Sequence, residues 1–356
     1  MSLFPFVFAV LPFISTAELK LPTFDTYVAR PPLHIKLQAQ GKPVGLTPDQ
    51  VKAAYHLPAA GGAGTIAIVD AFDYPTAQKD LAVFSKQFHL PECQTTNGCL
   101  EIINRGAKRA DTGWNQEAAL DIQWAHAIAP GAKILLVESR SASGRDFLDA
   151  VDYARRRNPV AISLSWGGPE FPASSKLDVH FTGVPVYAAA GDSGSEVEWP
   201  AVSAQVVAVG GTTLTLGTSG TVRSETAWEG SGGGLSKYVS EPDFQRSYQV
   251  PNAKGHRAVP DVSFNADPET GFAVYTKTGW AMVGGTSAGA PQWAAIAALG
   301  QSATNGNFYR DAATVNYADF FRDVRRGTNG SCKGLCSAGK KYDYVTGLGS
   351  PQTVRF

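Results

Sequence analysis

Ser287 is the residue best suited to nucleophilic chemistry. It lies in the segment Gly284-Gly285-Thr286-Ser287-Ala288-Gly289-Ala290-Pro291, directly before an apolar stretch expected to be helical. Glycines allow a sharp turn, and the unpaired backbone N–H groups of a helix N-terminus favour the oxyanion that forms when a serine oxygen attacks a carbonyl. A serine that only caps a helix after a glycine loop has the same local sequence. The segment therefore predicts either a catalytic serine or a simple cap.

A catalytic serine needs a neighbouring base. None of the six histidines lies in a His-Gly-Thr context; they are His34, His56, His89, His126, His180 and His256. Instead, the predicted helix 115–129 carries Glu117 and Asp121, and i, i+4 spacing places both carboxylates on one face. The neighbouring residues are mostly apolar, which favours burial over a solvated face. A buried pair shares a proton, and this sharing raises one pKa.

A third carboxylate, Asp192, follows the predicted strand 184–190 within Ala190-Gly191-Asp192-Ser193-Gly194. Functional sites of open α/β sheets gather at the carboxyl ends of the strands. An aspartate in a glycine turn is often only a turn former. A protonated aspartate, however, can donate a hydrogen bond to a developing oxyanion.

These motifs together resemble the sedolisin (serine-carboxyl peptidase) family. The resemblance covers the chain from Gly45 to the C-terminus. Three motifs carry the resemblance, and they occur in this order along the chain: Glu117-x-x-x-Asp121, Gly191-Asp192-Ser193-Gly194 and Gly285-Thr286-Ser287-Ala288-x-Ala290-Pro291. The supporting segments are Ser165-Trp166-Gly167-Gly168, Gly210-Gly211-Thr212-Thr213, Ser231-Gly232-Gly233-Gly234, Val259-Pro260-Asp261-Val262-Ser263 and Thr346-Gly347-Leu348-Gly349-Ser350-Pro351.

The resemblance implies a subtilisin-like fold and an acid-acting endopeptidase. Ser287 would be the nucleophile, Glu117 the general base and then the general acid, and Asp121 the residue that orients Glu117. Asp192 would complete the oxyanion hole with the Ser287 backbone N–H. Asp70, at the end of the first core strand, matches a position where the family extends its carboxyl network. The resemblance also implies that the substrate cleft is lined by Trp166, Gly167 and Gly168, pairing with a peptide in strand fashion.

A calcium site is also implied near the C-terminus. Two carboxylates and backbone carbonyls suit a hard cation, although two ordinary surface aspartates would look the same. The resemblance assigns one Ca²⁺ to the side chains of Asp323 and Asp343 and to the carbonyls of Val324, Gly339 and Lys341. Asn329-Gly330-Ser331 is, separately, a glycosylation sequon.

Strands and helices alternate along the chain, which predicts an α/β fold: a mainly parallel central sheet with helices on both faces. Strands are expected at 65–69, 133–138, 160–165, 184–190 and 205–209, and helices at 76–88, 115–129, 145–156 and 287–299. The helix 287–299 is expected to be the last. Short strands are expected in the loop-rich part around 214–278.

The N-terminus resembles a secretory signal peptide of residues 1–17, with an apolar run up to Ile14 and small residues before a cleavage site after Ala17. Residues 18–44 are expected to form an arm or a short pro-segment, and residues 45–356 the peptidase domain. Family members usually carry a longer folded prodomain. The cysteines form two local pairs, Cys93/Cys99 and Cys332/Cys336, and disulfides fit them better than a metal site does.

The balance of charged residues indicates which classes of binding partner are favoured. Lysine plus arginine and aspartate plus glutamate number 31 each, so net charge does not favour nucleic acid or an anionic membrane as a partner. We expect a secreted, extracellular monomer that acts on peptides or proteins. Two alternatives stay open: a Ser-His-Asp subtilase and a secreted peptide-binding relative without activity. The substrate preference and the choice between endopeptidase and tripeptidyl-peptidase action are not predicted.

Overall fold

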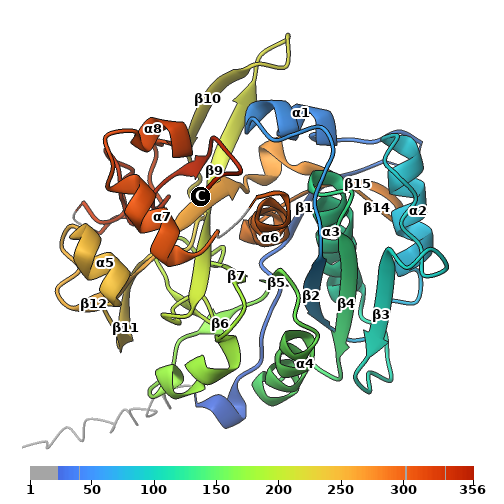
Figure 1. Cartoon of the computed structure of the whole chain (residues 1–356), viewed down its shortest axis with the longest axis horizontal. Coiled ribbons are helices and arrows are strands. Elements are labelled where there is room, and N and C mark those ends of the chain that lie inside the picture. Colours follow the sequence, from blue (N-terminus) through green and yellow to red (C-terminus); the bar gives the residue numbers. More distant parts are fainter. Residues whose placement is uncertain (1–22, 40, 301–302, 333) are drawn as a thin grey trace, which may run out of the picture.

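The computed structural model describes residues 23–39, 41–300, 303–332 and 334–356 (Figure 1). The expected signal peptide, residues 1–17, lies outside the described residues, and so does the start of the arm. Within the described part of the chain, no helix combines the length and the apolar character needed to cross a membrane.

The centre of the fold is an eight-stranded, mostly parallel sheet, as predicted. Its strands run in the order β10-β9-β7-β5-β2-β4-β3, and β13 also pairs with β9. Only the β9–β10 pairing is antiparallel. The strands are β2 (Thr65–Ala71), β3 (Leu100–Asn104), β4 (Lys133–Ser139), β5 (Ala161–Leu164), β7 (Val186–Ala189), β9 (Val206–Leu216), β10 (Val222–Ala227) and β13 (Val262–Asn265).

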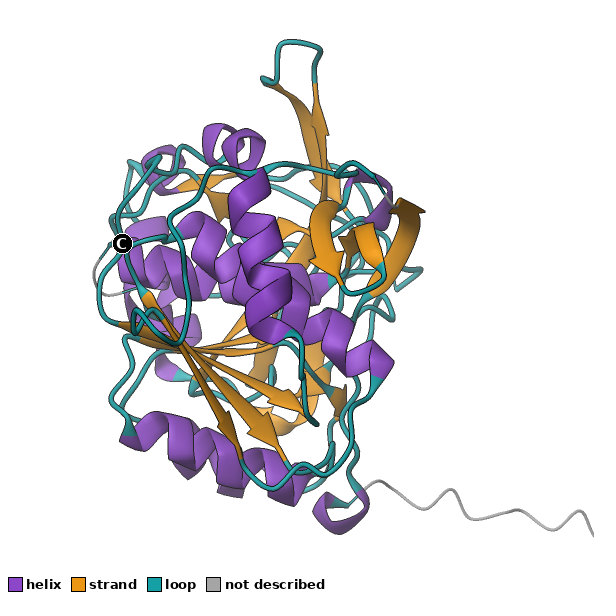
Figure 2. Cartoon of the chain, turned by 90° about the vertical axis from the view of Figure 1, so that its right-hand side faces the viewer, coloured by secondary structure: helices purple, strands orange, loops and turns teal. Residues whose placement is uncertain are grey.

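Helices cover both faces of this sheet. In β2, alternate residues point to opposite sides: Ile66 and Ile68 belong to the core beneath α3 (Thr112–Ile128) and α6 (Gly289–Leu299), whereas Ala67 and Val69 belong to the core beneath α4 (Gly144–Arg156). Figure 2 shows helices above and below the strands. The strands are buried on both faces, which explains why they read as continuous apolar runs.

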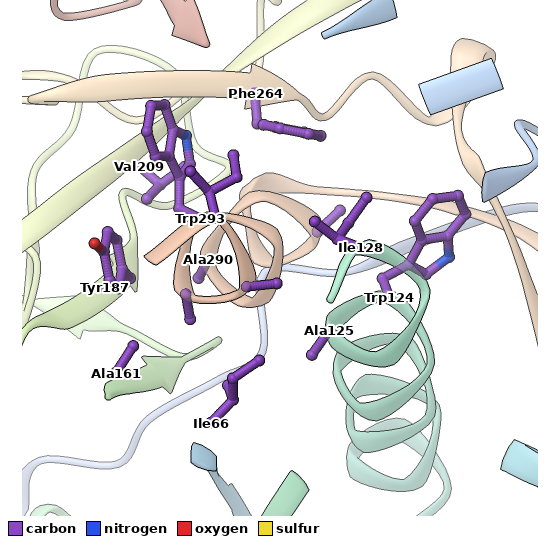
Figure 3. Close-up of a cluster of buried hydrophobic side chains, with 14 of the residues drawn as sticks. Ile66, Trp124, Ala125, Ile128, Ala161, Tyr187, Val209, Phe264, Ala290 and Trp293 are labelled. Carbon is purple, nitrogen blue, oxygen red and sulfur yellow. The ribbon is translucent and has the colours of Figure 1, made fainter. Parts of the chain in front are cut away.

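The helices α3 and α6 pack side by side in the larger core. Figure 3 shows the two helices beside each other, with Ala125 and Ile128 on α3, Ala290 on α6 and Ile66 of the sheet below; Trp293 of α6 points away from α3, toward Val209. Small alanines let the two helix backbones approach. Asp111 caps α3 by accepting from Gly113 N and Trp114 N, so α3 begins before the predicted start at 115. The helix is almost wholly buried, and its polar residues are therefore held in the interior.

A second, three-stranded sheet links the N-terminal arm to the turn that holds Ser287. The arm forms β1 (His34–Ala39), which pairs antiparallel with β15 (Gly279–Gly284), and β15 pairs in turn with β14 (Phe272–Thr276). Because β15 ends at the glycine turn before Ser287, the arm enters the molecule beside that serine.

The remaining elements flank these sheets. They are α1 (Pro48–Ala54), α2 (Ala77–Gln87), α5 (Asp243–Tyr248), α7 (Asn305–Ala312), α8 (Tyr317–Phe320) and the short strands β6 (Gly168–Pro169), β8 (Glu198–Trp199), β11 (Gly234–Ser240), β12 (His256–Val259), β16 (Phe321–Arg322) and β17 (Ser350–Pro351). The expectation that the helix ending at Leu299 is the last was wrong. Thr304 caps α7 by accepting from Asn307 N, and α7 buries Phe308 and Tyr309 although its polar sequence obscures that apolar face.

Candidate active site

Ser287 lies in a single helical turn, Thr286–Ala288, between β15 and α6. Gly285 precedes it with a φ of +123°, a conformation that L-residues rarely adopt. A Cβ at Gly285 would collide with the carbonyl oxygen of Pro32 and would lie 2.7 Å from Asp192 Oδ2. The glycine therefore leaves room beside Ser287 and Asp192, which the Pro32 carbonyl oxygen occupies.

The α3 carboxylates lie where the sequence predicted, on the buried face that meets α6. Glu117 and Asp121 are both fully buried. Ser165, directly after β5, places its Oγ 2.9 Å from Asp121 Oδ1 and 3.1 Å from the Ser287 carbonyl oxygen. Ser165 therefore connects the sheet, α3 and the turn that holds Ser287, and it fixes Asp121 relative to Ser287.

The burial of this pair controls its protonation. Desolvation, followed by repulsion from Asp121 and Asp70, raises the pKa of Glu117 well above its ordinary value. Desolvation and the Asp70 charge likewise raise the pKa of Asp121, and the Ser165 hydrogen bond only partly offsets the shift. No lysine or arginine of the described chain forms an ion pair with either carboxyl group. The pair is therefore expected to retain protons well above the pH at which free carboxyl groups ionise.

Asp70 extends the carboxyl cluster through the sheet. It is the sixth residue of β2, and only 1% of its surface is exposed. Desolvation raises its pKa to about 8, with a further contribution from the charge of Glu138. Neither of its oxygens has a hydrogen-bond partner among the described residues. A neutral Asp70 is the state that such an environment favours.

Asp192 faces the same turn from the carboxyl end of β7. Its Oδ1 accepts from Thr286 N at 2.8 Å, and Thr286 Oγ1 lies 2.8 Å from the same oxygen. Desolvation raises the pKa of Asp192, although these hydrogen bonds and His34 act in the opposite direction. The residue is thus held beside Ser287 with Oδ2 turned toward the space above Gly285.

The N-terminal arm occupies the cleft next to these groups. Ser287 Oγ donates to the Pro32 carbonyl oxygen at 2.6 Å. Two residues earlier, Arg30 N donates to Gly167 O (2.9 Å) and Gly167 N donates to Arg30 O (3.1 Å). Gly167 therefore pairs with a peptide in strand fashion, and in this structure the peptide is the chain's own arm. Gly167 and Gly168 line this cleft together with arm residues and Asp192.

His34, two residues beyond Pro32, contacts the proposed oxyanion residue. Its Nε2 lies 3.0 Å from Asp192 Oδ2, and the interaction with Asp192 raises the pKa of the imidazole. His34 is half exposed on the arm and makes no hydrogen bond to Ser287. Of the other histidines, His126 contacts Pro91 and His180 contacts Asp152. None of the six therefore forms the hydrogen bond to Ser287 that a Ser-His-Asp site requires.

Trp166 does not line the cleft, and that expectation is corrected. The indole is fully buried, donates from Nε1 to Val69 O at 2.9 Å and stacks on Phe147 with ring centroids 4.1 Å apart. Successive residues of an extended segment point to opposite sides. The large side chain therefore enters the core under α4, while the glycines that follow face the peptide.

The residues of the implied calcium site lie in one loop region. Asp343 Oδ2 accepts from Gly339 N at 3.0 Å, and Asp323 Oδ1 accepts from Lys341 N at 2.8 Å. Desolvation raises the pKa of Asp343 to about 6, which marks a buried carboxylate without a cationic partner. Asp323, by contrast, is paired with Arg325 at 2.7 Å.

The oxygen donors of this loop fit a hard cation. No described residue donates a backbone hydrogen bond to the carbonyl oxygens of Val324, Gly339 or Lys341. The Lys341 ammonium lies 5.9 Å from the Tyr317 ring centroid, so its positive charge interacts with the ring. Two carboxylates and three carbonyls of this kind match the ligands that calcium prefers.

The disulfides and the glycosylation sequon are the remaining features predicted from the sequence. Both predicted disulfides, Cys93–Cys99 and Cys332–Cys336, are formed. The sequon asparagine Asn329 is only 4% exposed, and its Nδ2 donates to Ser231 O at 2.7 Å. The nitrogen that would carry a glycan is therefore engaged inside the folded domain.

Four residues of the site region were not singled out from the sequence: Ser165, Thr286, His34 and Glu138. Ser165 and Thr286 lie within motifs quoted for the family resemblance, so their positions carried a signal. No sequence signal marked His34 or Glu138, because the importance of each depends on the distant residue that it contacts. His34 contacts Asp192 from the arm, and Glu138 lies beside Asp70 through strand pairing.

Comparisons with known proteins agree with this geometry. Residues 110–318 match the model of the Subtilase family. The chain is 32% identical to kumamolisin of Bacillus sp. (strain MN-32) over 92% of its length, and 29% identical to sedolisin of Pseudomonas sp. (strain 101) over 88%. It spans 67% and 61% of the length of these two relatives. A solved structure of Pseudomonas sedolisin, described as a serine-carboxyl proteinase complexed with two molecules of pseudo-iodotyrostatin, superposes with a TM-score of 0.75 at 27% identity, covering 88% of this chain and 96% of that one.

Proposed function

Because the chain belongs to the sedolisin family of serine-carboxyl peptidases, we propose that it is an endopeptidase that hydrolyses peptide bonds in acid through Ser287, Glu117, Asp121 and Asp192. The observation that carries this proposal is the buried carboxyl pair of α3 next to the Ser287 turn, with which no lysine or arginine of the described residues forms an ion pair. The mechanism requires that this pair and Asp192 keep part of their protons, so activity should fall as a rising pH removes them.

The pair performs the acid–base work. In the proposed reaction, ionised Glu117 accepts the Ser287 hydroxyl proton as Oγ attacks the scissile carbonyl carbon. Asp121 keeps a shared proton and holds Glu117 in position, and Ser165 fixes Asp121. Glu117 then gives its proton to the leaving amine as the C–N bond breaks, which leaves an acyl-serine ester. Water, deprotonated by Glu117, hydrolyses that ester and regenerates the hydroxyl.

Asp192 stabilises the tetrahedral intermediate. The negative charge forms on the former carbonyl oxygen, and a protonated Asp192 donates a hydrogen bond to it together with the Ser287 backbone N–H. The raised pKa of Asp192 supports this role, because an ionised carboxylate would repel the oxyanion. Thr286 holds the carboxyl group through Oδ1 and leaves Oδ2 directed at the space kept open by Gly285.

The arm is proposed to act as a short pro-segment. The Pro32 carbonyl oxygen takes the hydrogen bond of Ser287, and the backbone of Arg30 takes the edge of the cleft that a substrate would use. A substrate can therefore bind only after this segment moves out. The pairing of His34 with Asp192 adds a contact that acid weakens, because protonation removes the charge of the aspartate.

Calcium, secretion and a monomeric state belong to the same proposal. Asp323, Val324, Gly339, Lys341 and Asp343 would hold one Ca²⁺, which would order the loop between α8 and β17 without entering the reaction. The two disulfides support an oxidising, extracellular environment. The expected substrates are peptides or unfolded proteins, which can pair in strand fashion with Gly167.

A digestion experiment tests the activity. A peptide library is incubated with the purified protein at about pH 4, where a raised-pKa carboxyl pair is partly protonated, and the products are read by mass spectrometry. Ser287→Ala is expected to remove cleavage, while Ser219→Ala, an exposed serine between β9 and β10, leaves it unchanged. Equal cleavage by the Ser287→Ala protein would overturn the serine mechanism.

The same experiment separates the alternatives. A Ser-His-Asp subtilase would be most active near neutral or alkaline pH, because its histidine must be deprotonated. A peptide-binding relative would bind library peptides without cleaving them at any pH. The intact carboxyl network and the absence of a histidine bonded to Ser287 favour the acid mechanism over both.

A further inference from the structure

The network of the proposed function has a buried neighbour that the mechanism leaves unused. Glu138 lies in β4 and is only 2% exposed. In the parallel pairing of β2 with β4, Asp70 and Glu138 are register partners. Residues opposite each other on paired strands direct their side chains to the same face of the sheet. Both carboxyl groups therefore lie side by side on the face that carries α3.

We propose that Glu138 is the outer member of the carboxyl network, a positioning residue that stores the proton needed by Glu117 and Asp121 and connects it to the surface. This inference rests on the proposed function. The proposed network then consists of Ser287, Glu117, Asp121 and Asp70, followed by Glu138 on the strand next to that of Asp70.

The surroundings of Glu138 lead toward solvent. Its Oε1 accepts from Tyr74 N at 2.9 Å. Asp73 and the exposed Asn104 of β3 lie next to it, and Asn104 Nδ2 donates to Asp73 Oδ1 at 3.2 Å. Glu138 is thus the point at which the buried carboxyl groups of α3 and β2 approach polar groups at the protein surface. Protons can enter there without passing through the occupied cleft.

The charges that face Glu138 are almost all negative. Asp70 faces it from β2 and Asp73 from the following loop, whereas Glu117 and Asp121 of α3 act through Asp70. Asn104 and the Tyr74 N–H are the polar groups that favour its ionised form. Burial nevertheless raises the pKa of Glu138 to about 7. Repulsion between Glu138 and Asp70 acts in both directions, so the state of one group sets the proton affinity of the other.

The variant Glu138→Gln keeps the shape and removes the charge. Because the Glu138 charge raises the pKa of Asp70, its removal should let Asp70 ionise at lower pH. The Asp70 charge raises the pKa of Glu117 and Asp121, so its earlier appearance should raise the proton affinity of the catalytic pair. The alkaline limb of the pH profile of kcat/KM is therefore expected to move toward higher pH by about half a pH unit or more. Glu101→Gln is the matched control, because Glu101 lies exposed on β3 and changes the net charge equally. A change in kcat with little change in KM is expected for a residue that contacts no substrate.

An infrared titration tests the network without activity. In the Ser287→Ala protein, the carboxylic acid C=O absorption is followed against pH. Adding Glu138→Gln should remove one absorbing group that titrates near neutrality and shift the groups that remain, whereas adding Glu101→Gln should do neither. If the wild-type protein hydrolyses no peptide, the proposed function fails, but this titration still decides the role of Glu138.

Two results would overturn the inference: identical pH profiles for Glu138→Gln and Glu101→Gln, or an infrared titration that Glu138→Gln leaves unchanged. If Glu138→Gln does not fold, Asp70→Asn provides the reciprocal test in the Ser287→Ala background. Removing Asp70 should then lower the apparent pKa of the remaining group near neutrality, and no shift would equally reject the coupling.

Discussion

Ser287 donates its hydrogen bond to the carbonyl oxygen of Pro32, 2.6 Å away, while neither carboxylate oxygen of Glu117 has a hydrogen-bond partner among the described residues. The nucleophile and its proposed base are therefore close but not joined as long as the arm is in the cleft. The Ser287 hydroxyl still lowers the pKa of Glu117 through its capacity to hydrogen-bond, against the larger raising effect of burial. Removing the arm would free this proton for transfer.

The contact between His34 and Asp192 should slow the start of activity. His34→Ala is expected to raise the initial rate on a small peptide by up to about fivefold, because a half-exposed ion pair contributes up to about 1 kcal/mol. The freshly purified protein is assayed by continuous fluorescence, with His56→Ala as the control. A rate equal to that of the control protein would show that this contact does not hold the arm in place.

The proposed oxyanion role of Asp192 can be tested separately from its role in packing. Asp192→Ala should lower kcat by about 10² to 10³, as expected for the loss of one oxyanion donor. Asp192→Asn retains an N–H donor at every pH and should lose less, with a shallower decline toward neutrality. Steady-state kinetics from pH 3 to 8 measure both variants, and equal losses in the two would argue against hydrogen-bond donation.

Stability should fall as the pH rises from about 4 toward 8. Asp70 has a folded pKa of about 8 against an ordinary value of 3.8, so the folded state binds more protons than the unfolded state between these values. The stabilisation is complete below the lower value and is lost as the pH passes the upper one. Asp70→Asn should flatten this dependence, raising Tm at pH 8 relative to pH 5 by roughly a few degrees compared with the wild type. Parallel Tm curves for the two proteins would contradict a neutral buried Asp70.

Calcium should stabilise the fold through Asp343. Adding Ca²⁺ at about 100 times its Kd should stabilise the protein by about 2.7 kcal/mol, and a chelator should reverse this. Asp343→Asn should remove the response, while Asp243→Asn, on the exposed surface of α5, should keep it. Scanning calorimetry with and without calcium measures the effect. A response that survives in Asp343→Asn would place the ion elsewhere.

The sequence predicted those parts of the fold that depend on local patterns. The apolar runs of β2 and β4 predicted buried parallel strands, and the i, i+4 spacing of Glu117 and Asp121 predicted a shared helical face. The burial of that face followed from the alanines and apolar residues around it. In each case, the relevant information lies within one helix or strand.

The features that sequence reasoning missed depend on pairings between distant segments. The arm carries no motif that specifies Pro32 as the partner of Ser287, and the partnership arises because β1 pairs with β15. Glu138 became relevant only through its register with Asp70. The orientation of Trp166 was wrong because its motif shows a neighbourhood but not the side to which each residue points. Strand register and side-chain direction are set by tertiary packing.

The bound arm also affects how any affinity of this enzyme is interpreted. A segment tethered to the domain it occupies has a local concentration of the order of millimolar, independent of dilution. A free substrate must compete against that constant concentration, so an apparent KM measured on the intact chain combines substrate affinity with the equilibrium for arm release. Dilution leaves this competition unchanged, whereas acid, which neutralises Asp192, shifts it toward substrate.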